Sequence, residues 1–266
     1  MGTTSLTLVD RGTISADLNF VLDGYVMGTA AEPNPEQAYE DFAVWNLVID
    51  HPDATILWDT GPHHDAADGY WPDPLYQAFT PNDPANHRLD DDLDAAGYDL
   101  TDIDAVVMSH LHLDHAGGLH HFAGTDVPIY LHREEIPFAY FSAKTPEGSV
   151  AYLASDFDHD LNWQLVHGHR HTLFDGVELH HLPGHTPGLL GALLHLDDES
   201  VIVAGDEVYL RSNYEDAWPM ATSLLWSNQA WEDSLHRVRE LERQHDATVL
   251  FGHDLSQFHD LQERWG

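Results

Sequence analysis

Residues 109–118 read Ser-His-Leu-His-Leu-Asp-His-Ala-Gly-Gly and follow directly on an apolar run. In an extended segment alternate side chains share a face, so His110 and His112 can hold one cation. Asp114 and His115 leave in another direction and can hold a second cation. These four residues supply only half of the ligands that two cations need. The stretch therefore predicts half of a two-metal site at the end of a strand.

The missing ligands are expected to be His, Asp or Glu residues further along the chain. Three positions fit because each follows an apolar run and lies beside glycine, namely His185, Asp206 and His253. All of these clusters come just after predicted strands. In α/β proteins, ligands collect in the crevice beyond the carboxyl ends of the strands. The sequence therefore predicts one site assembled from distant segments.

Not every histidine pair supports such a prediction, because the chain has 22 His among 266 residues. In the segment 167–171, which reads His-Gly-His-Arg-His, no carboxylate follows at a suitable spacing. We interpret this segment as an exposed strand or turn.

The combined pattern resembles the metallo-β-lactamase superfamily, and the match to N-acyl homoserine lactonases is closer still. The resemblance covers nearly the whole chain, and its most discriminating feature is Asp206 followed three residues later by Tyr209. The other motifs are His-Leu-His-Leu-Asp-His at 110–115, Trp-Asp-Thr-Gly at 58–61, Pro-Gly-His-Thr-Pro-Gly at 183–188 and Phe-Gly-His-Asp at 251–254. The alternation of strands and helices fits an α/β fold. The resemblance implies an αββα sandwich with two metals along one edge.

The resemblance also implies a role for each ligand. It assigns His110, His112 and His185 to one metal, Asp114, His115 and His253 to the other, and Asp206 to a bridge between them. The set is rich in His and the chain has no Cys, which favours two zinc ions. Iron, cobalt and manganese stay open, since imidazole and carboxylate bind them too.

Two further positions follow from the resemblance. Asp59 stands where the superfamily has a carboxylate that hydrogen-bonds a metal-ligating histidine and fixes its tautomer. Capping of the next turn is the alternative role for Asp59. His63 and His64 have no counterpart in the family, and we interpret them as a solvated turn.

The catalytic residues that the resemblance implies are Tyr209 and Asp114. The Tyr209 hydroxyl would stabilise charge on the carbonyl oxygen under attack, a contribution of roughly 3 kcal/mol for one such donor. Asp114 would carry a proton to the leaving alkoxide.

The expected substrate pocket rests on apolar and aromatic side chains. Segment 61–87 interleaves five prolines with aromatic residues. We expect the aromatic side chains of such a loop to pack against another surface. The loop could line a substrate's acyl chain, pack against a second subunit of a homodimer, or pack within the chain. Leu113 departs from the phenylalanine that many lactonases carry and also belongs to the pocket lining. The predicted lining is Val21, Tyr25, Met27, Tyr70, Trp71, Phe79 and Leu113.

The amino-acid composition limits the classes of protein to which the chain can belong. We expect one domain over residues 1–266, because no Ser/Gly/Pro-rich linker separates two halves. The absence of Cys excludes disulfides and thiolate ligands, and with them the lactam-hydrolysing relatives that use a cysteine. The start of the chain has no basic segment, and no stretch is apolar enough for a signal or a membrane span. We therefore expect a cytoplasmic protein with no membrane contact.

The charge of the chain is far from that of an ordinary soluble domain. The formal net charge is −36, and Lys144 is the only lysine. We interpret this as adaptation to high salt, because such charge destabilises the compact state unless ions screen it. A simply acidic mesophilic protein is the alternative. The chain has too few basic residues to neutralise phosphates, which argues against nucleic acid as a partner.

These observations predict a two-metal hydrolase that opens a neutral lactone, and the resemblance points to an N-acyl homoserine lactone. Another lactone or ester, such as a pyridoxine-derived or simple γ-lactone, needs the same ring chemistry and stays open. A glutathione-thioester hydrolase would share the ligands but should carry a basic C-terminal extension. A non-catalytic metal or lactone binder would not need Tyr209.

Overall fold

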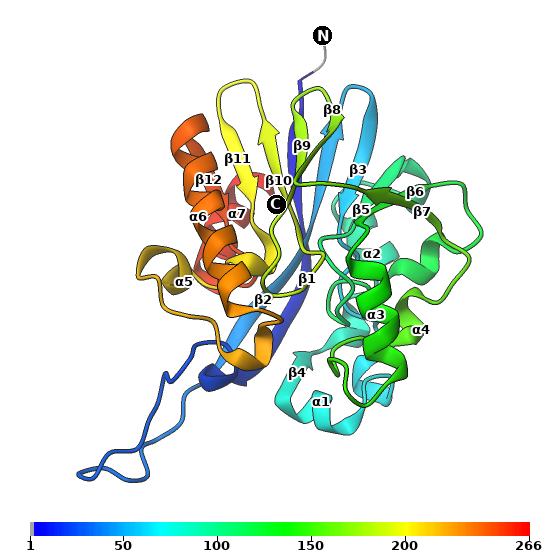
Figure 1. Cartoon of the computed structure of the whole chain (residues 1–266). Coiled ribbons are helices and arrows are strands. Elements are labelled where there is room, and N and C mark those ends of the chain that lie inside the picture. The colour runs from blue at the N-terminus through cyan, green and yellow to red at the C-terminus, as the bar shows by residue number, and fades with distance from the viewer. Residues whose placement is uncertain (1–2) are drawn as a thin grey trace.

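The computed structural model describes residues 3–266 and shows two β-sheets packed face to face, with helices outside them (Figure 1). The prediction for the start of the chain concerns Met1 and Gly2 in part, and these two residues lie outside the described range. The strands are β1 (Ser5–Asp17), β2 (Tyr39–His51), β3 (Ala54–Trp58), β4 (Phe79–Asn82), β5 (Ala105–Val107), β6 (Pro128–His132), β7 (Asn162–Val166), β8 (Arg170–Phe174), β9 (Val177–His181), β10 (Leu190–His195), β11 (Ser200–Val203) and β12 (Ala247–Leu250).

The helices vary in length from one turn to five. The α-helices are α1 (Asp73–Ala78), α2 (Leu89–Ala95), α3 (Glu135–Lys144), α4 (Ala154–Phe157), α5 (Arg211–Glu215), α6 (Asn228–His245) and α7 (Leu255–Trp265). The 3₁₀ helices are η1 (Leu18–Phe20), η2 (Ala66–Asp68), η3 (Pro84–Asn86), η4 (Leu100–Asp102), η5 (Leu119–Phe122), η6 (Gly205–Glu207) and η7 (Thr222–Leu224). Within residues 3–266, none of them combines the length and the apolar composition needed to span a bilayer.

The first sheet has the strand order β4-β1-β2-β3-β5-β6-β7, and the second has the order β12-β11-β10-β9-β8. β3 and β5 are parallel neighbours, as are β11 and β12. Parallel neighbours end at the same edge of their sheet, so the segments that follow these four strands are brought together. This arrangement gives the fold one functional edge.

Alternation of side chains along the strands builds three apolar layers. In β11, Val201 and Val203 point into the core between the sheets, while Ile202 points outward to α6. In β5, Val106 likewise points outward toward α2 and α3, opposite to its two strand neighbours. Both faces of each sheet are therefore buried, as in a sandwich covered by helices.

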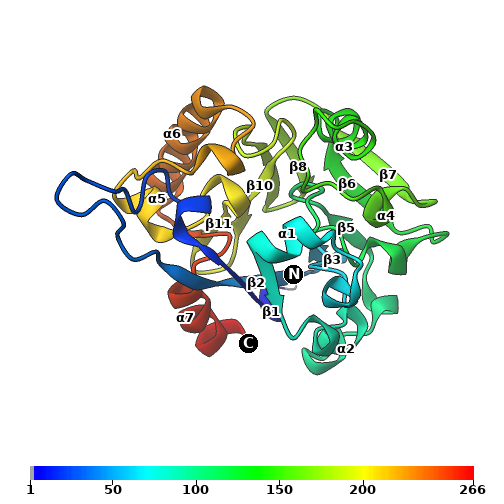
Figure 2. The ribbon, with the colours of Figure 1, turned by 90° about the horizontal axis from the view of Figure 1, so that it is seen from below.

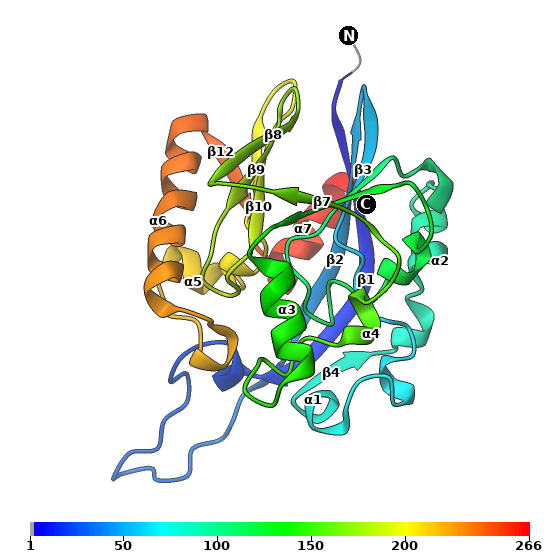
Figure 3. The ribbon, with the colours of Figure 1, turned by 45° about the vertical axis from the view of Figure 1, so that its right-hand side comes forward.

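The outer layers lie on opposite sides of the molecule, and Figure 3 shows α6 beside the five-stranded sheet and α2 beside the seven-stranded sheet. Helix α6 buries one stripe of apolar side chains, Trp231, Leu235, Val238 and Leu241. Its N-cap is Ser227, whose side chain accepts a hydrogen bond from the Ala230 N–H. The αββα sandwich predicted from the sequence is confirmed.

Three pairs of consecutive strands form antiparallel hairpins, namely β2–β3, β8–β9 and β10–β11. β1 is long, because a bulge between Asp10 and Thr13 lets it continue along β2. The short strand β4 lies within the proline-rich segment 61–87 and pairs with β1.

Candidate active site

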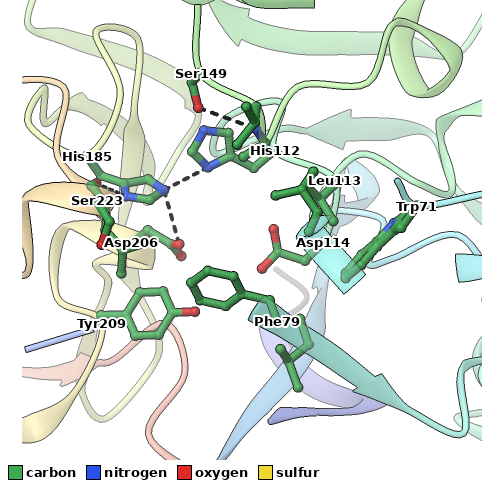
Figure 4. Close-up of a pocket in the computed structure, with 15 residues that line it drawn as sticks. Trp71, Phe79, His112, Leu113, Asp114, Ser149, His185, Asp206, Tyr209 and Ser223 are labelled. Atoms are coloured by element: carbon green, nitrogen blue, oxygen red, sulfur yellow. Dashed lines mark hydrogen bonds and ion pairs between the residues drawn. The ribbon is translucent and has the colours of Figure 1, made fainter. Parts of the chain in front are cut away.

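Seven side chains from four segments of the chain meet at the functional edge, and almost all of them are buried. His110, His112, Asp114 and His115 follow β5, and His185 lies in the turn between β9 and β10. Asp206 lies in η6 after β11, and His253 follows β12. Figure 4 shows His112, Asp114, His185 and Asp206 around one cavity. The structure thus brings together all the residues that the sequence predicted as metal ligands.

Asp206 lies between two groups of ligands. Its Oδ2 is 3.3 Å from Nε2 of His185, and its Oδ1 is 3.2 Å from Nε2 of His253 and 3.5 Å from Nε2 of His115. Two sets could each hold a metal ion, namely His110 with His112 and His185, and Asp114 with His115 and His253. One carboxylate oxygen of Asp206 faces each set, which is the geometry that a bridging ligand needs.

Unpartnered nitrogen and oxygen atoms show that the site fits cations. Nε2 of His110, His115 and His253 and Oδ1 of Asp206 are all buried without a hydrogen-bond partner. Buried polar atoms are normally paired, and an unpaired group costs about 1–3 kcal/mol. Four such atoms directed at one another are explained by metal ions that they would coordinate.

The second ring nitrogen of these histidines is held in place. Nδ1 of His185 lies 2.6 Å from the Leu224 carbonyl oxygen, and Nδ1 of His253 lies 2.8 Å from that of Ala43. A carbonyl oxygen only accepts, so each Nδ1 carries a proton, and Nε2 is the ring atom left to bind a cation. This pattern is common for metal-ligating histidines.

Burial and charge set the protonation of the cluster. Burial lowers the pKa of His110, His112 and His185, so these imidazoles are neutral ligands at neutral pH. Burial also acts to lower the pKa of His115 and His253, but the carboxylates of neighbouring aspartates outweigh it and raise the pKa. A cation has to displace those protons, so metal binding weakens as the pH falls.

Asp59 follows β3 and contacts the segment that carries the first four predicted ligands. It accepts hydrogen bonds from the N–H and the hydroxyl of Ser109, both at 2.7 Å, and its Oδ2 lies 3.0 Å from Nδ1 of His115. Its φ of 56° is unusual for a residue other than glycine. Such a conformation is retained where the surroundings require it. The structure thus places Asp59 against a predicted ligand, as a supporting residue would be.

Replacing Asp59 by asparagine is expected to weaken metal binding 10- to 100-fold, the usual cost of losing such a partner. Asparagine tolerates a positive φ, but its NH₂ group opposes the N–H of His115. Competition with a chelator of known affinity measures the effect. Asp53→Asn in the exposed turn before β3 is the matched control. Unchanged affinity in Asp59→Asn would contradict the role.

No motif in the sequence points to Glu135, the first residue of α3. This carboxylate is fully buried and accepts four hydrogen bonds, from the Leu111 N–H, the Tyr152 hydroxyl, the Thr186 hydroxyl and the Gly188 N–H. Leu111 lies between two predicted ligands, and Thr186 follows a third. Gly188 is required here, because a Cβ would lie 2.4 Å from Glu135. Glu135 therefore joins the two loops that carry the first ligand set.

Replacing Glu135 by glutamine is expected to destabilise the fold by about 2 kcal/mol. The NH₂ group of glutamine would face one of the four donors, and that donor would be left without an acceptor. Thermal unfolding measures the loss. The neighbouring Glu134→Gln is the control, since Glu134 is half-exposed and forms a surface ion pair with Arg133. Equal melting temperatures for the two variants would show that Glu135 is not a structural link.

Tyr209 places its hydroxyl at the cavity beside the predicted ligands (Figure 4). Its ring packs 4.1 Å from the His253 ring, and its carbonyl accepts the His253 N–H at 2.9 Å. Burial and the charges of Asp114 and Asp206 raise the pKa of Tyr209, so its hydroxyl stays protonated. Tyr209 can therefore donate a hydrogen bond to a group that enters the cavity.

The cavity has an empty volume of about 620 Å³, including the part open to solvent. The lining has polar and apolar members. The apolar members, called the apolar wall below, are Ile14, Trp71, Leu75, Phe79, Leu113, Val150, Ala151 and Leu224. Figure 2 shows α1 and β4, which flank this wall, across the centre of the functional edge.

The predicted substrate-binding residues divide into two groups. Trp71, Phe79 and Leu113 line the cavity, so segment 61–87 does wall it. Val21 is in the core beneath α6, and Tyr25 and Met27 lie in the loop that projects from the molecule at the lower left of Figure 1. Tyr70 is directed at Asp156. The structure brings none of these last four residues to the cavity lining.

The cavity also contains residues that the sequence analysis did not identify. Ser149 and Val150 come from the loop between α3 and α4, and Ser223 and Leu224 come from the short helix η7. Neither segment has a recognisable motif. The segment 167–171 is exposed in its first four residues, as predicted.

Comparison with known proteins fixes the class. Residues 39–253 match the family model of the metallo-beta-lactamase superfamily, and the chain belongs to this superfamily. Several of its relatives within this superfamily are N-acyl homoserine lactonases. The chain is 30% identical to N-acyl homoserine lactonase AiiB from Agrobacterium fabrum over 96% of this chain and 95% of that protein. It is 28% identical to AiiA from Bacillus thuringiensis subsp. kurstaki over 80% and 82% of the two chains.

Solved structures agree with this assignment. A Bacillus thuringiensis AiiA mutant with N-decanoyl-L-homoserine bound at the active site has a TM-score of 0.83 at 25% identity, covering 98% of this chain and 97% of that one. An N-acyl homoserine lactone hydrolase with the product N-hexanoyl-L-homoserine bound at its catalytic metal centre has a TM-score of 0.82 at 25% identity and the same coverage. The resemblance predicted from the sequence is confirmed.

Proposed function

We propose that this chain is a metal-dependent hydrolase that opens the ring of N-acyl homoserine lactones. The observation that carries the proposal is the position of Asp206 between two sets of ligands, with the Tyr209 hydroxyl on the same cavity. The activity named for the relatives supports the choice of substrate. A binder without catalysis has no need for a buried hydroxyl donor beside the ligands.

The residues that would hold two divalent ions are the seven predicted ligands, with Asp206 shared. When bound, such ions lower the pKa of water toward 7 and polarise a carbonyl group. Zinc suits five imidazoles and two carboxylates and is the metal that we propose, with iron, cobalt and manganese as alternatives. Elemental analysis of the purified protein decides between them.

Tyr209 and Asp114 have separate roles in the opening of the lactone ring. The Tyr209 hydroxyl donates a hydrogen bond to the carbonyl oxygen, on which negative charge develops as the oxygen of a water molecule adds to the ring carbon and makes it tetrahedral. The bond from that carbon to the ring oxygen then breaks, and the leaving alkoxide takes the proton that the water gave up. Asp114, which borders the cavity and is partly exposed, is the residue that we propose carries this proton.

The apolar wall is proposed to bind the acyl chain. Trp71, Phe79 and Leu113 offer a surface on which methylene groups lose contact with water, worth about 0.8 kcal/mol for each buried CH₂ group. Binding should therefore tighten as the acyl chain lengthens until the wall is covered.

A proton-release assay over a panel of substrates tests the proposal. We expect N-acyl homoserine lactones to be hydrolysed faster than simple γ-lactones, pyridoxine-derived lactones and glutathione thioesters. Hydrolysis of thioesters with lactones untouched would overturn the choice of substrate. The absence of any turnover by metal-loaded protein would favour the non-catalytic binder.

Three further properties are proposals. We infer a cytoplasmic location, a single domain over residues 1–266 and, through exposed aromatic residues such as Phe20, Tyr25 and Trp226, a capacity to form a homodimer. Sedimentation of the purified chain measures the last of these.

We also propose that the protein is adapted to high salt. Helix α2 has three consecutive aspartates in its first turn, and Arg88 is the basic residue paired with two of them. We expect the melting temperature to rise by at least about 4 °C between about 0.1 M and 1 M salt, as the Debye length falls from about 10 Å to about 3 Å. Melting curves that do not move would contradict the adaptation.

A further inference from the structure

Three histidines outside the proposed active site gather where the turn after β3 packs against η5. The ring of His63 stacks on that of His64 at 4.4 Å and lies 5.0 Å from that of His120. One ring nitrogen from each residue lies within 4.8 Å of the other two. The three side chains are half-buried, so the turn is not simply solvated as the sequence suggested.

The backbone holds the two segments close together. The Gly117 N–H donates to the Gly61 carbonyl at 2.8 Å. A Cβ at Gly117 would lie 2.1 Å from the backbone nitrogen of His63. Only glycine permits this approach. On its other face the His63 ring stacks on Tyr70 at 3.8 Å, so it has little freedom to turn away from the cluster.

The surroundings of His120 resemble those of a ligating histidine, and an acidic residue lies beside the other two rings. Nδ1 of His120 lies 3.0 Å from the Gly117 carbonyl oxygen, so it carries the proton and Nε2 keeps its lone pair. The Asp65 carboxylate lies 3.6 Å from Nε2 of His64 and 4.0 Å from Nδ1 of His63. Nδ1 of His63 accepts the Asp65 N–H at 3.1 Å. Binding of a cation through Nε2 moves the His63 proton to Nδ1, where the Asp65 carboxylate replaces that N–H as its partner.

We propose that His63, His64 and His120 form a third metal site, separate from the pair of ligand sets around Asp206. Three imidazoles favour a first-row divalent ion such as Zn²⁺, Ni²⁺ or Cu²⁺ over Mg²⁺ or Ca²⁺. Three protein ligands leave a further position for water or for the Asp65 carboxylate.

Such an ion would tie segment 61–71 to residues 117–121. Trp71 at the end of the first segment lines the substrate cavity, and the second segment follows directly on the predicted ligand His115. The site therefore stabilises a wall of the cavity, and its occupancy adds stability according to mass action.

The test is a count of metal ions on protein without a histidine tag. Wild type and the double variant His64→Gln/His120→Gln are dialysed against the same micromolar free Zn²⁺, and bound zinc per chain is measured by elemental analysis. We expect the wild type to hold one more zinc than the double variant. The pair His167→Gln/His169→Gln, from the exposed segment, is the matched control and should keep the wild-type content.

Equal zinc content in wild type and the double variant overturns the proposal, and so does an equal loss in the control pair. Because the test is a difference between variants, it does not depend on how many ions the site around Asp206 holds. If the double variant fails to fold, the single variant His64→Gln replaces it, with the same two outcomes.

Discussion

Replacing Asp206 by asparagine is expected to lower kcat/KM for an N-acyl homoserine lactone by roughly 10³- to 10⁴-fold. The side chain faces both ligand sets, through Oδ2 toward His185 and through Oδ1 toward His253. Asparagine offers one acceptor oxygen and turns an NH₂ group toward the other set. The loss of one Lewis acid costs about 5 kcal/mol, and each 1.36 kcal/mol is a factor of ten in rate.

The same variant should bind less metal than the wild type. Metal content and steady-state kinetics measured on one preparation link the two effects. Asp198→Asn in the exposed turn between β10 and β11 is the control, and it should match the wild type in both. An Asp206→Asn protein with full metal content and wild-type kinetics would show that this carboxylate does not bridge the ligand sets.

Replacing Tyr209 by phenylalanine is expected to lower kcat by about 10² to 10³, the usual cost of removing one oxyanion donor, with KM nearly unchanged. The substitution removes only the hydroxyl, so the ring keeps its contacts with His253 and Phe42. Metal content should equal that of the wild type, because Tyr209 is not among the ligands.

The control for this variant is Tyr214→Phe. The Tyr214 hydroxyl donates to Glu242 at 2.7 Å, away from the cavity, so its removal affects stability rather than rate. A Tyr209→Phe protein that keeps its kcat would remove the hydroxyl from the mechanism and leave the metal site in place.

The metal ligands could be predicted because each stands in a local pattern. His110 to His115 are six consecutive residues after a strand, and Asp206 and His253 each follow an apolar run. The parallel pairs β3–β5 and β11–β12 then carry these patterns to one edge of the fold. A short motif at a strand end is enough to place its side chains once the sheet topology is known.

The residues that were not predicted lack such patterns. Glu135 looks like an ordinary acidic residue at a helix start, and its four donors come from positions 111, 152, 186 and 188. Ser149 reaches the cavity from a loop and Ser223 from the short helix η7, and the position of both segments depends on tertiary packing. Val21 and Met27 were predicted at the pocket from residue type alone, which does not distinguish a core position from an exposed loop.

The central claim is that lactone hydrolysis depends on metal bound around Asp206. It is tested by measuring metal content and lactone hydrolysis together while metal is removed and restored. We expect purified protein in molar salt to open an N-acyl homoserine lactone, to lose this activity when a chelator strips its metal, and to recover it as divalent metal returns to the ligands around Asp206. Undiminished lactone hydrolysis by protein shown to be free of metal would contradict the proposed metal-dependent mechanism.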